Sequence, residues 1–132
     1  MIVSETSVRV LYAHTDKMGI VNNGRYFEFF ETGRNSLLRD IYPYTELEKR
    51  NIGLPVIEAY AKYISTAYYD DIILIRSSLR ARPTVKVKID YELYVNDKLI
   101  VTGYTIHSFV NLQSLKPVRP PKEFIDKLIH RL

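Results

Sequence analysis

The chain has 132 residues, of which 46% are hydrophobic and 26% charged, so we expect one globular domain spanning residues 1–132. It has no cysteine, which excludes disulfides, thiolate nucleophiles and cysteine-bound zinc. No apolar run approaches the roughly 20 residues that cross a bilayer, and no signal-peptide pattern is present, so we expect a cytoplasmic protein without metal or cofactor. The net charge of +4, spread along the chain, favours anionic partners such as nucleic acid or a phosphorylated small molecule, or simply marks a solvated surface.

The first third of the chain predicts a strand, a polar loop and a long helix. Val3–Tyr12 indicates a strand, and Ala13–Gly24 is rich in residues that form turns. From Tyr26 onward, apolar residues recur at steps of four and three, which indicates an amphipathic helix of about five turns. The residues on this apolar line are Tyr26, Phe30, Gly33, Leu37 and Ile41.

Both ends of this helix carry signals. Asn22 or Asn23 can cap its start through a side-chain oxygen, and Pro43 ends it. Gly33 lies within the apolar stripe, where it costs roughly 1 kcal/mol of helix propensity relative to Ala. We therefore expect the helix to approach a sheet closely at this residue.

The rest of the chain predicts four strands and a short terminal helix, with at most one further turn at Thr45–Asn51. The expected strands are Leu54–Tyr69, Asp71–Arg82, Val85–Val95 and Leu99–Asn111. Asn96-Asp97 is a signal for a tight hairpin. Phe124, Ile125, Leu128 and Ile129 indicate the terminal helix. This order predicts an α+β domain in which an antiparallel sheet covers one central helix.

The segment Tyr12–Tyr26 carries the most specific motif, in which a polar stretch leads to Asp16 and then to the turn Gly19-Ile20-Val21. Phe30-Glu31-x-x-Arg34, Tyr69-Asp70-Asp71 and the basic, proline-rich stretch Lys116–Pro121 follow in order. With these motifs at these spacings, the chain resembles the 4-hydroxybenzoyl-CoA thioesterase-like family of acyl-CoA thioesterases. The resemblance implies the hotdog fold, a curved antiparallel five-stranded sheet wrapped around one long central helix, with a short C-terminal helix.

The same resemblance implies hydrolysis of an acyl-CoA thioester to a free acid and coenzyme A. A thioester is already activated, because its leaving thiol has a pKa near ~8.5, so the enzyme needs an oxygen nucleophile and stabilisation of the oxyanion. Asp16 would serve as general base or as nucleophile. The backbone N–H of Asn23, at the start of the helix, would polarise the carbonyl, and Gly19 would shape the turn.

Four residues are expected to contact substrate. Asn22 stands beside Asn23, where many relatives carry histidine, and an amide forms hydrogen bonds without titrating near neutral pH. Tyr26 either lines the acyl pocket or packs in the core. Arg82 and Lys86 belong to a basic cluster that is suited to the phosphates of coenzyme A, or else is ordinary surface charge.

Other polar residues have competing interpretations. His14 either tunes Asp16 or is an exposed loop residue, and His107 is expected at a strand surface or at the edge of the core. Glu31 and Arg34 lie three residues apart on the helix, a spacing that permits an ion pair, and Glu31 is the reserve catalytic carboxylate.

Alternatives with the same fold stay open. An acyl-carrier-protein thioesterase would differ only in its partner, and a non-catalytic hotdog binding module would lack the chemistry. A dehydratase needs a histidine paired with a helix carboxylate, which the loop is not expected to supply.

Nucleic acid is not an expected partner, because no strand carries stacking aromatics with a basic pattern. An exposed sheet edge and the resemblance predict a homo-oligomer, a dimer or a tetramer.

Overall fold

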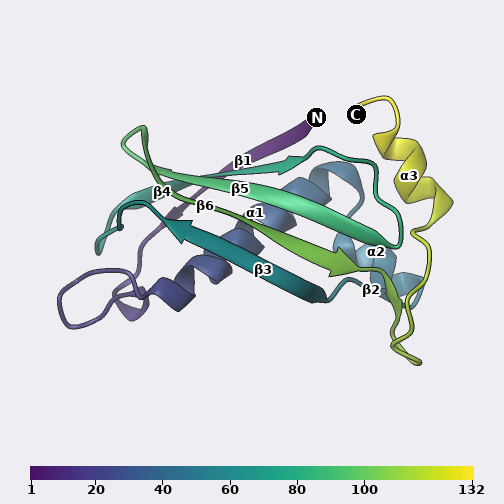
Figure 1. Ribbon diagram of the computed structural model, residues 1–132, viewed down its shortest axis with the longest axis horizontal. Coiled ribbons are helices and arrows are strands. Elements are labelled where there is room, and N and C mark those ends of the chain that lie inside the picture. Colours follow the sequence, from purple (N-terminus) through teal and green to yellow (C-terminus); the bar gives the residue numbers. More distant parts are fainter.

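A curved five-stranded antiparallel sheet wraps around one long helix in the computed structural model, which describes all 132 residues (Figure 1). This is the architecture that the sequence predicts. In spatial order the strands are β1 (Ile2–Arg9), β4 (Ile72–Leu79), β5 (Lys86–Val95), β6 (Lys98–Ser108) and β3 (Val56–Tyr63). The smaller elements are η1 (Tyr12–His14), η2 (Asn23–Arg25), α2 (Tyr44–Lys49), β2 (Ile52–Gly53), β7 (Val110–Asn111) and α3 (Lys122–Leu128).

The long helix α1 (Tyr26–Ile41) has the predicted bounds, and its apolar line is buried against β1, β4 and β5. Tyr42 leaves the helical conformation directly before Pro43, which ends the helix as expected. At Gly33 the helix touches β4 so closely that a Cβ atom would lie 2.5 Å from Cγ2 of Ile75 and would overlap the Ser77 hydroxyl. The close approach inferred from Gly33 is therefore confirmed.

The strands follow the predicted alternation, with differences at their ends. The inward residues of β5 form part of the core, and Asn96 and Asp97 have φ angles of 49° and 64°, as a tight two-residue hairpin requires. The strand expected over Leu54–Tyr69 is shorter, because β3 ends at Tyr63 and the chain then crosses to β4. The expectation of a continuous strand to Tyr69 is therefore wrong.

The sheet has two edge strands, β1 and β3, and the molecule has two distinct ends. Nearly all residues of β3 are accessible to solvent, including the large side chains of Ile57, Tyr60 and Tyr63. The loop between β1 and α1 lies at one end of the molecule, whereas α3 and the connection between β4 and β5 lie at the other (Figure 1). None of the helices has both the length and the apolar character needed to cross a bilayer.

Candidate active site

Asp16 lies in a tight turn of the loop between β1 and α1. Its side-chain Oδ1 accepts hydrogen bonds from the backbone N–H groups of Met18, at 2.8 Å, and Ile20, at 3.3 Å. Its backbone is held as well, because Asp16 N donates to the carbonyl of Ile20 at 2.9 Å. Gly19 takes a φ of +76°, in the left-handed region that favours glycine. These contacts leave Oδ2 of Asp16 without a hydrogen-bond partner in the chain.

The Asp16 loop is fixed to the segment that joins β3 to β4. Val21 N donates to the carbonyl of Ala67 at 3.0 Å, and Tyr69 N donates to the carbonyl of Gly19 at the same distance. Backbone bonds on both sides of the turn thus hold the loop against the sheet, which gives Asp16 a defined position despite its exposure.

The helix start is capped by Asn22 rather than Asn23. The Asn22 side chain accepts from Gly24 N at 3.1 Å, and its carbonyl accepts from Arg25 N at 2.9 Å. Tyr26 N donates to the carbonyl of Asn23. The N–H of Asn23 is therefore the one backbone donor of this turn that has no acceptor in the chain.

Three of the predicted site residues line one open pocket of about 380 Å³, namely Asp16, Asn22 and Asn23. Gly19 belongs to the same loop, and the other walls are Met18, Ile20 and Val21. Asp16, which has a free carboxylate oxygen, and Asn23, which has a free backbone N–H, thus line a common space. The loop brings together what a carbonyl reaction needs, a group that attacks or activates water and a donor for the oxyanion.

Tyr26 is buried beneath this pocket. Its hydroxyl accepts from Ala67 N at 3.0 Å and lies 3.3 Å from Oγ1 of Thr66. The ring therefore ties the start of α1 to the β3–β4 segment, whereas a contact between Tyr26 and substrate stays a prediction. Tyr63, which the sequence did not single out, donates from its hydroxyl to the carbonyl of Asn23 at 3.0 Å. Its only sequence signal is an aromatic residue at the end of a strand.

Arg82 and Lys86 lie apart from Asp16 in the chain's own fold. Arg82 belongs to the connection between β4 and β5 and lines a cavity of about 330 Å³ together with Arg119, and Lys86 begins β5. This region is at the opposite end of the molecule from the Asp16 loop (Figure 1). Neither Arg82 nor Arg119 has a carboxylate within ion-pair distance.

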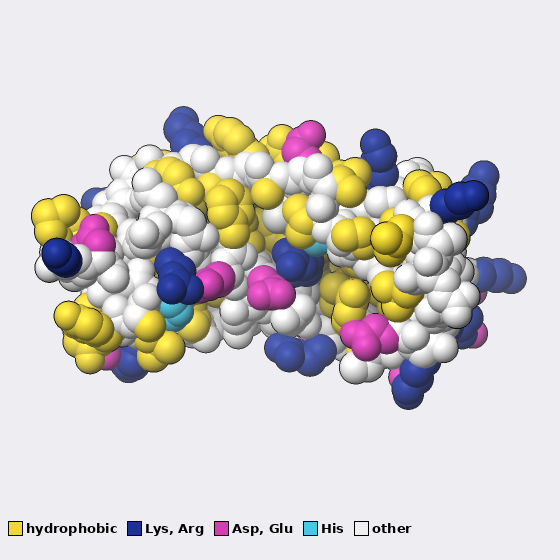
Figure 2. Space-filling model, turned by 90° about the horizontal axis from the view of Figure 1, so that it is seen from below, with side chains coloured by type: hydrophobic (Ala, Val, Ile, Leu, Met, Phe, Trp, Pro, Cys, Tyr) yellow, Lys and Arg dark blue, Asp and Glu magenta, His cyan; other side chains and the backbone are white.

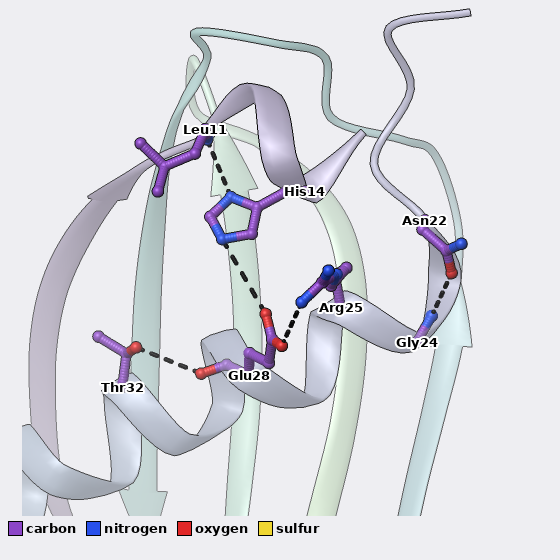
Figure 3. A network of polar contacts seen from close by, with 7 residues as sticks. All are labelled: Leu11, His14, Asn22, Gly24, Arg25, Glu28 and Thr32. Atoms are coloured by element: carbon purple, nitrogen blue, oxygen red, sulfur yellow. Dashed lines mark hydrogen bonds and ion pairs between the residues drawn. The ribbon is translucent and has the colours of Figure 1, made fainter. Parts of the chain in front are cut away.

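His14 is directed toward Glu28 on α1 (Figure 3). Its side chain is only 14% exposed, and Nε2 lies 4.0 Å from a carboxylate oxygen of Glu28, so the expectation of an exposed loop histidine is wrong. The loop therefore supplies the pairing of histidine and helix carboxylate that the sequence did not reveal. Both ring nitrogens of His14 have a neighbour: Nε2 faces Glu28, and Nδ1 accepts from Leu11 N at 2.8 Å.

Glu31 and Arg34 do not form the ion pair that their spacing permits. Arg34 instead donates from Nη1 to the hydroxyl of Tyr91 at 3.3 Å, and neither charged side chain has an ion-pair partner in the chain. Both residues line a hollow of about 270 Å³ between α1 and β3, together with Phe27, Glu28, Val56, Ala59 and Thr105. In the space-filling view, charged side chains lie along the middle of this face with hydrophobic ones on either side (Figure 2).

His107 lies in the core and not at its edge, with no exposed surface. Its Nδ1 lies 3.0 Å from the carbonyl of Leu54 and its Nε2 lies 2.8 Å from Oγ1 of Thr105, which is 2.6 Å from the Tyr91 hydroxyl. Burial lowers the pKa of His107 to about 4; the bond to Leu54 opposes this shift, and the Arg34 cation adds to it. No group of three or more histidines and carboxylates is arranged to hold a metal ion.

Residues 10–128 match the model of the thioesterase-like superfamily, and the chain belongs to this family. The acyl-CoA thioesterase YbgC of Haemophilus influenzae is 29% identical over 118 residues, which cover 88% of this chain and 87% of that protein. A crystal structure of a DHNA-CoA thioesterase from Staphylococcus aureus has a TM-score of 0.86 and 27% identity over 90% of this chain and 81% of that one. A 4-hydroxybenzoyl CoA thioesterase shares the fold, with a TM-score of 0.87 at 16% identity over 96% of this chain and 99% of that one. The predicted fold and the predicted enzyme class, a thioester hydrolase, are confirmed.

Proposed function

We propose that this thioesterase hydrolyses acyl-CoA, with Asp16 and the backbone N–H of Asn23 acting on the same thioester carbonyl. One observation carries the proposal: the pocket beside α1 is lined by a carboxylate with a free oxygen and by the one unpaired N–H of the helix start. The names of the relatives support acyl-CoA as the substrate.

The carbonyl oxygen accepts from Asn23 N–H, which stabilises negative charge as it develops in a site where the first turn of α1 adds its positive dipole end. Oδ2 of Asp16 then either takes a proton from water or attacks the carbonyl carbon to form a mixed anhydride that water opens. In both routes the thiolate of coenzyme A leaves without a strong acid, because its conjugate thiol has a pKa of only ~8.5.

The test is thiol release from short, long and aromatic acyl-CoA substrates by wild type and by Asp16→Asn. The amide oxygen of the introduced side chain can keep both N–H bonds of the turn, so we expect an unchanged Tm and a loss in kcat on the order of 100-fold or more. Asp97→Asn is the matched control, since asparagine tolerates the left-handed backbone there. Undiminished turnover by Asp16→Asn would remove Asp16 from the mechanism, and no release by wild type would remove the proposed activity.

Arg82 and Lys86 are proposed to bind the phosphates of coenzyme A on behalf of a neighbouring subunit, because they lie at the far end of their own chain from Asp16. Unpaired arginines suit phosphate, which their planar fork contacts through two N–H groups at once. Arg82→Ala is expected to raise KM for acyl-CoA and to leave hydrolysis of the corresponding acyl-pantetheine unchanged, with Arg131→Ala as the control. Equal effects on both substrates would contradict a phosphate contact, and comparison with acyl-carrier-protein substrates identifies the natural carrier.

A homo-oligomer is part of the proposal. The edge strand β3 exposes Ile57, Tyr60 and Tyr63, and unpaired Glu31 and Arg34 lie in the adjoining hollow. A second copy that pairs edge to edge would extend the sheet, cover these exposed side chains and supply opposite charges for Glu31 and Arg34. Light scattering should give at least twice the monomer mass of 15.5 kDa, and Ile57→Lys should reduce it, whereas Ile129→Lys, directly after α3, should not. A wild-type monomer at micromolar concentration would contradict this assembly.

A further inference from the structure

The His14 side chain joins the two parts of the candidate site through contacts with both (Figure 3). On the loop side, Nδ1 accepts from Leu11 N at 2.8 Å, and His14 N in turn donates to the carbonyl of Leu11 at 3.0 Å. On the helix side, the ring meets Phe29 edge to face with centroids 5.1 Å apart, and Nε2 lies 4.0 Å from Oε2 of Glu28. One imidazole therefore touches the segment that follows β1 and the first turn of α1.

These contacts define which nitrogen of the neutral ring carries the proton. A backbone N–H only donates, so Nδ1 must present its lone pair to Leu11, and the single proton of the neutral ring belongs on Nε2. That N–H points toward Glu28, whose other oxygen is 2.7 Å from Nη1 of Arg25. Arg25 holds Glu28, and Glu28 faces the imidazole, so the ring is oriented from both sides.

His14 also lies at the point where the Asp16 loop closes. Its carbonyl accepts from Asn22 N at 2.9 Å, and the neighbouring pair Thr15 and Val21 forms an antiparallel bridge. Asp16 is the next residue inside this closed loop, and Asn23 is the next residue outside it. The distance between the carboxylate and the free N–H of Asn23 is therefore set by the backbone at His14 and Asn22.

We infer that His14 is a positioning residue, whose Nδ1 acceptor fixes the closing point of the loop and thereby the separation of Asp16 from the N–H of Asn23. This inference rests on the proposed function. It predicts an effect on rate and not on affinity, because a displacement of about 1 Å between reacting groups can cost 10²-fold in rate while leaving binding intact. The effect on stability is small, because Leu11 is a surface residue whose N–H can bond to water once the imidazole is removed.

Three substitutions of His14 distinguish the contact of its ring with Leu11 from its contact with Glu28. His14→Ala removes both contacts. His14→Asn places an amide oxygen near the position of Nδ1, where it can accept from Leu11, but does not reach Glu28. His14→Gln can present an N–H toward Glu28 but leaves Leu11 without its acceptor. The exposed His130, replaced by Ala, is the matched control.

We expect His14→Ala and His14→Gln to lower kcat by about 10- to 100-fold with KM within about twofold of wild type, and His14→Asn to recover most of the lost rate. A second readout does not depend on turnover: amide hydrogen exchange in residues 11–22 should accelerate in the Ala and Gln variants and return to the wild-type rate in the Asn variant. The inference is overturned if His14→Ala keeps full kcat, if Gln rescues and Asn does not, or if the loss falls on KM. A wild type that releases no thiol but shows the predicted exchange pattern would refute the activity and keep the role of His14 in the loop.

Discussion

Acidification should destabilise this protein through one buried side chain, His107. The Leu54 carbonyl can only accept, so Nδ1 of His107 donates to it and Nε2 is left as an acceptor. The Thr105 hydroxyl therefore donates to Nε2, and the Tyr91 hydroxyl donates to Thr105. Arg34 then donates to the Tyr91 oxygen. Each of these bonds thus has a defined direction. A second proton on His107 would make Nε2 a donor, which conflicts with the bond that it accepts from Thr105.

The size of the effect follows from the pKa of His107, which is lowered from 6.5 to about 4 in the folded state. Between these values the unfolded chain binds the proton and the folded chain does not, so the free energy of unfolding falls as pH falls. Above about pH 7 the unfolded chain is also unprotonated at this residue, so the free energy of unfolding loses nothing through His107 there. The difference of about 2.5 pH units corresponds to about 3 kcal/mol by pH 4, a large share of the 5–15 kcal/mol typical of a domain.

Urea unfolding of wild type and His107→Asn at pH 7, 5.5 and 4 measures this contribution. The variant costs stability at pH 7, but its amide can still donate to Leu54 and does not titrate, so the gap between the two proteins should narrow by about 3 kcal/mol on acidification. His130→Asn, at an exposed histidine, should track the wild type at every pH. A gap that stays constant between pH 7 and pH 4 would refute the neutral, buried state of His107.

Substitutions at three further positions test local geometry. Gly33→Ala should cost about 1–3 kcal/mol in urea unfolding, because the new methyl group meets Ser77 and the strand beneath it; a stabilised variant would contradict the contact. Tyr26→Phe should cost about 1–3 kcal/mol with little change in KM, since it leaves the buried N–H of Ala67 without an acceptor, whereas a raised KM would point to a substrate contact. Gly19→Ala should lower stability by about 1–2 kcal/mol through its φ of +76°, and Gly19→Asn should cost less; equal losses would argue against backbone strain.

Features that depend on local spacing were predictable from the sequence. The apolar steps from Tyr26 to Ile41 and the following Pro43 define α1 with its observed bounds, because a helix period and a proline stop act within a few residues. Asn96-Asp97 forms the predicted hairpin for the same reason. The joint pocket of Asp16 and Asn23 could also be predicted, since Asn23 follows Asp16 by seven positions and the polar loop between them has to turn.

Features that depend on contacts across the fold were not predictable. The spacing of Glu31 and Arg34 permits an ion pair, yet the Arg34 guanidinium contacts Tyr91, 57 residues further along the chain. The basic character of Arg82 suggested a substrate contact, but its distance from Asp16 follows from the order of strands in the sheet, which spacing along one sequence does not encode. His14 presents the same difficulty, because the direction of its ring depends on how the loop packs on α1.

The residues that would carry out the chemistry all belong to one short stretch of chain, from His14 to Asn23, whereas the hollow beside α1 is built from α1, β3 and β6. Changes in the middle of α1 or in β3 can therefore alter the face that a second copy would cover without moving the carboxylate or the helix start. Changes in the loop would instead move the carboxylate or the helix start and leave the hollow as it is. Such a division would let surface substitutions change the assembly while the proposed reacting groups stay in place, and it makes the segment from residue 11 to residue 26 a candidate for transfer between scaffolds of this shape.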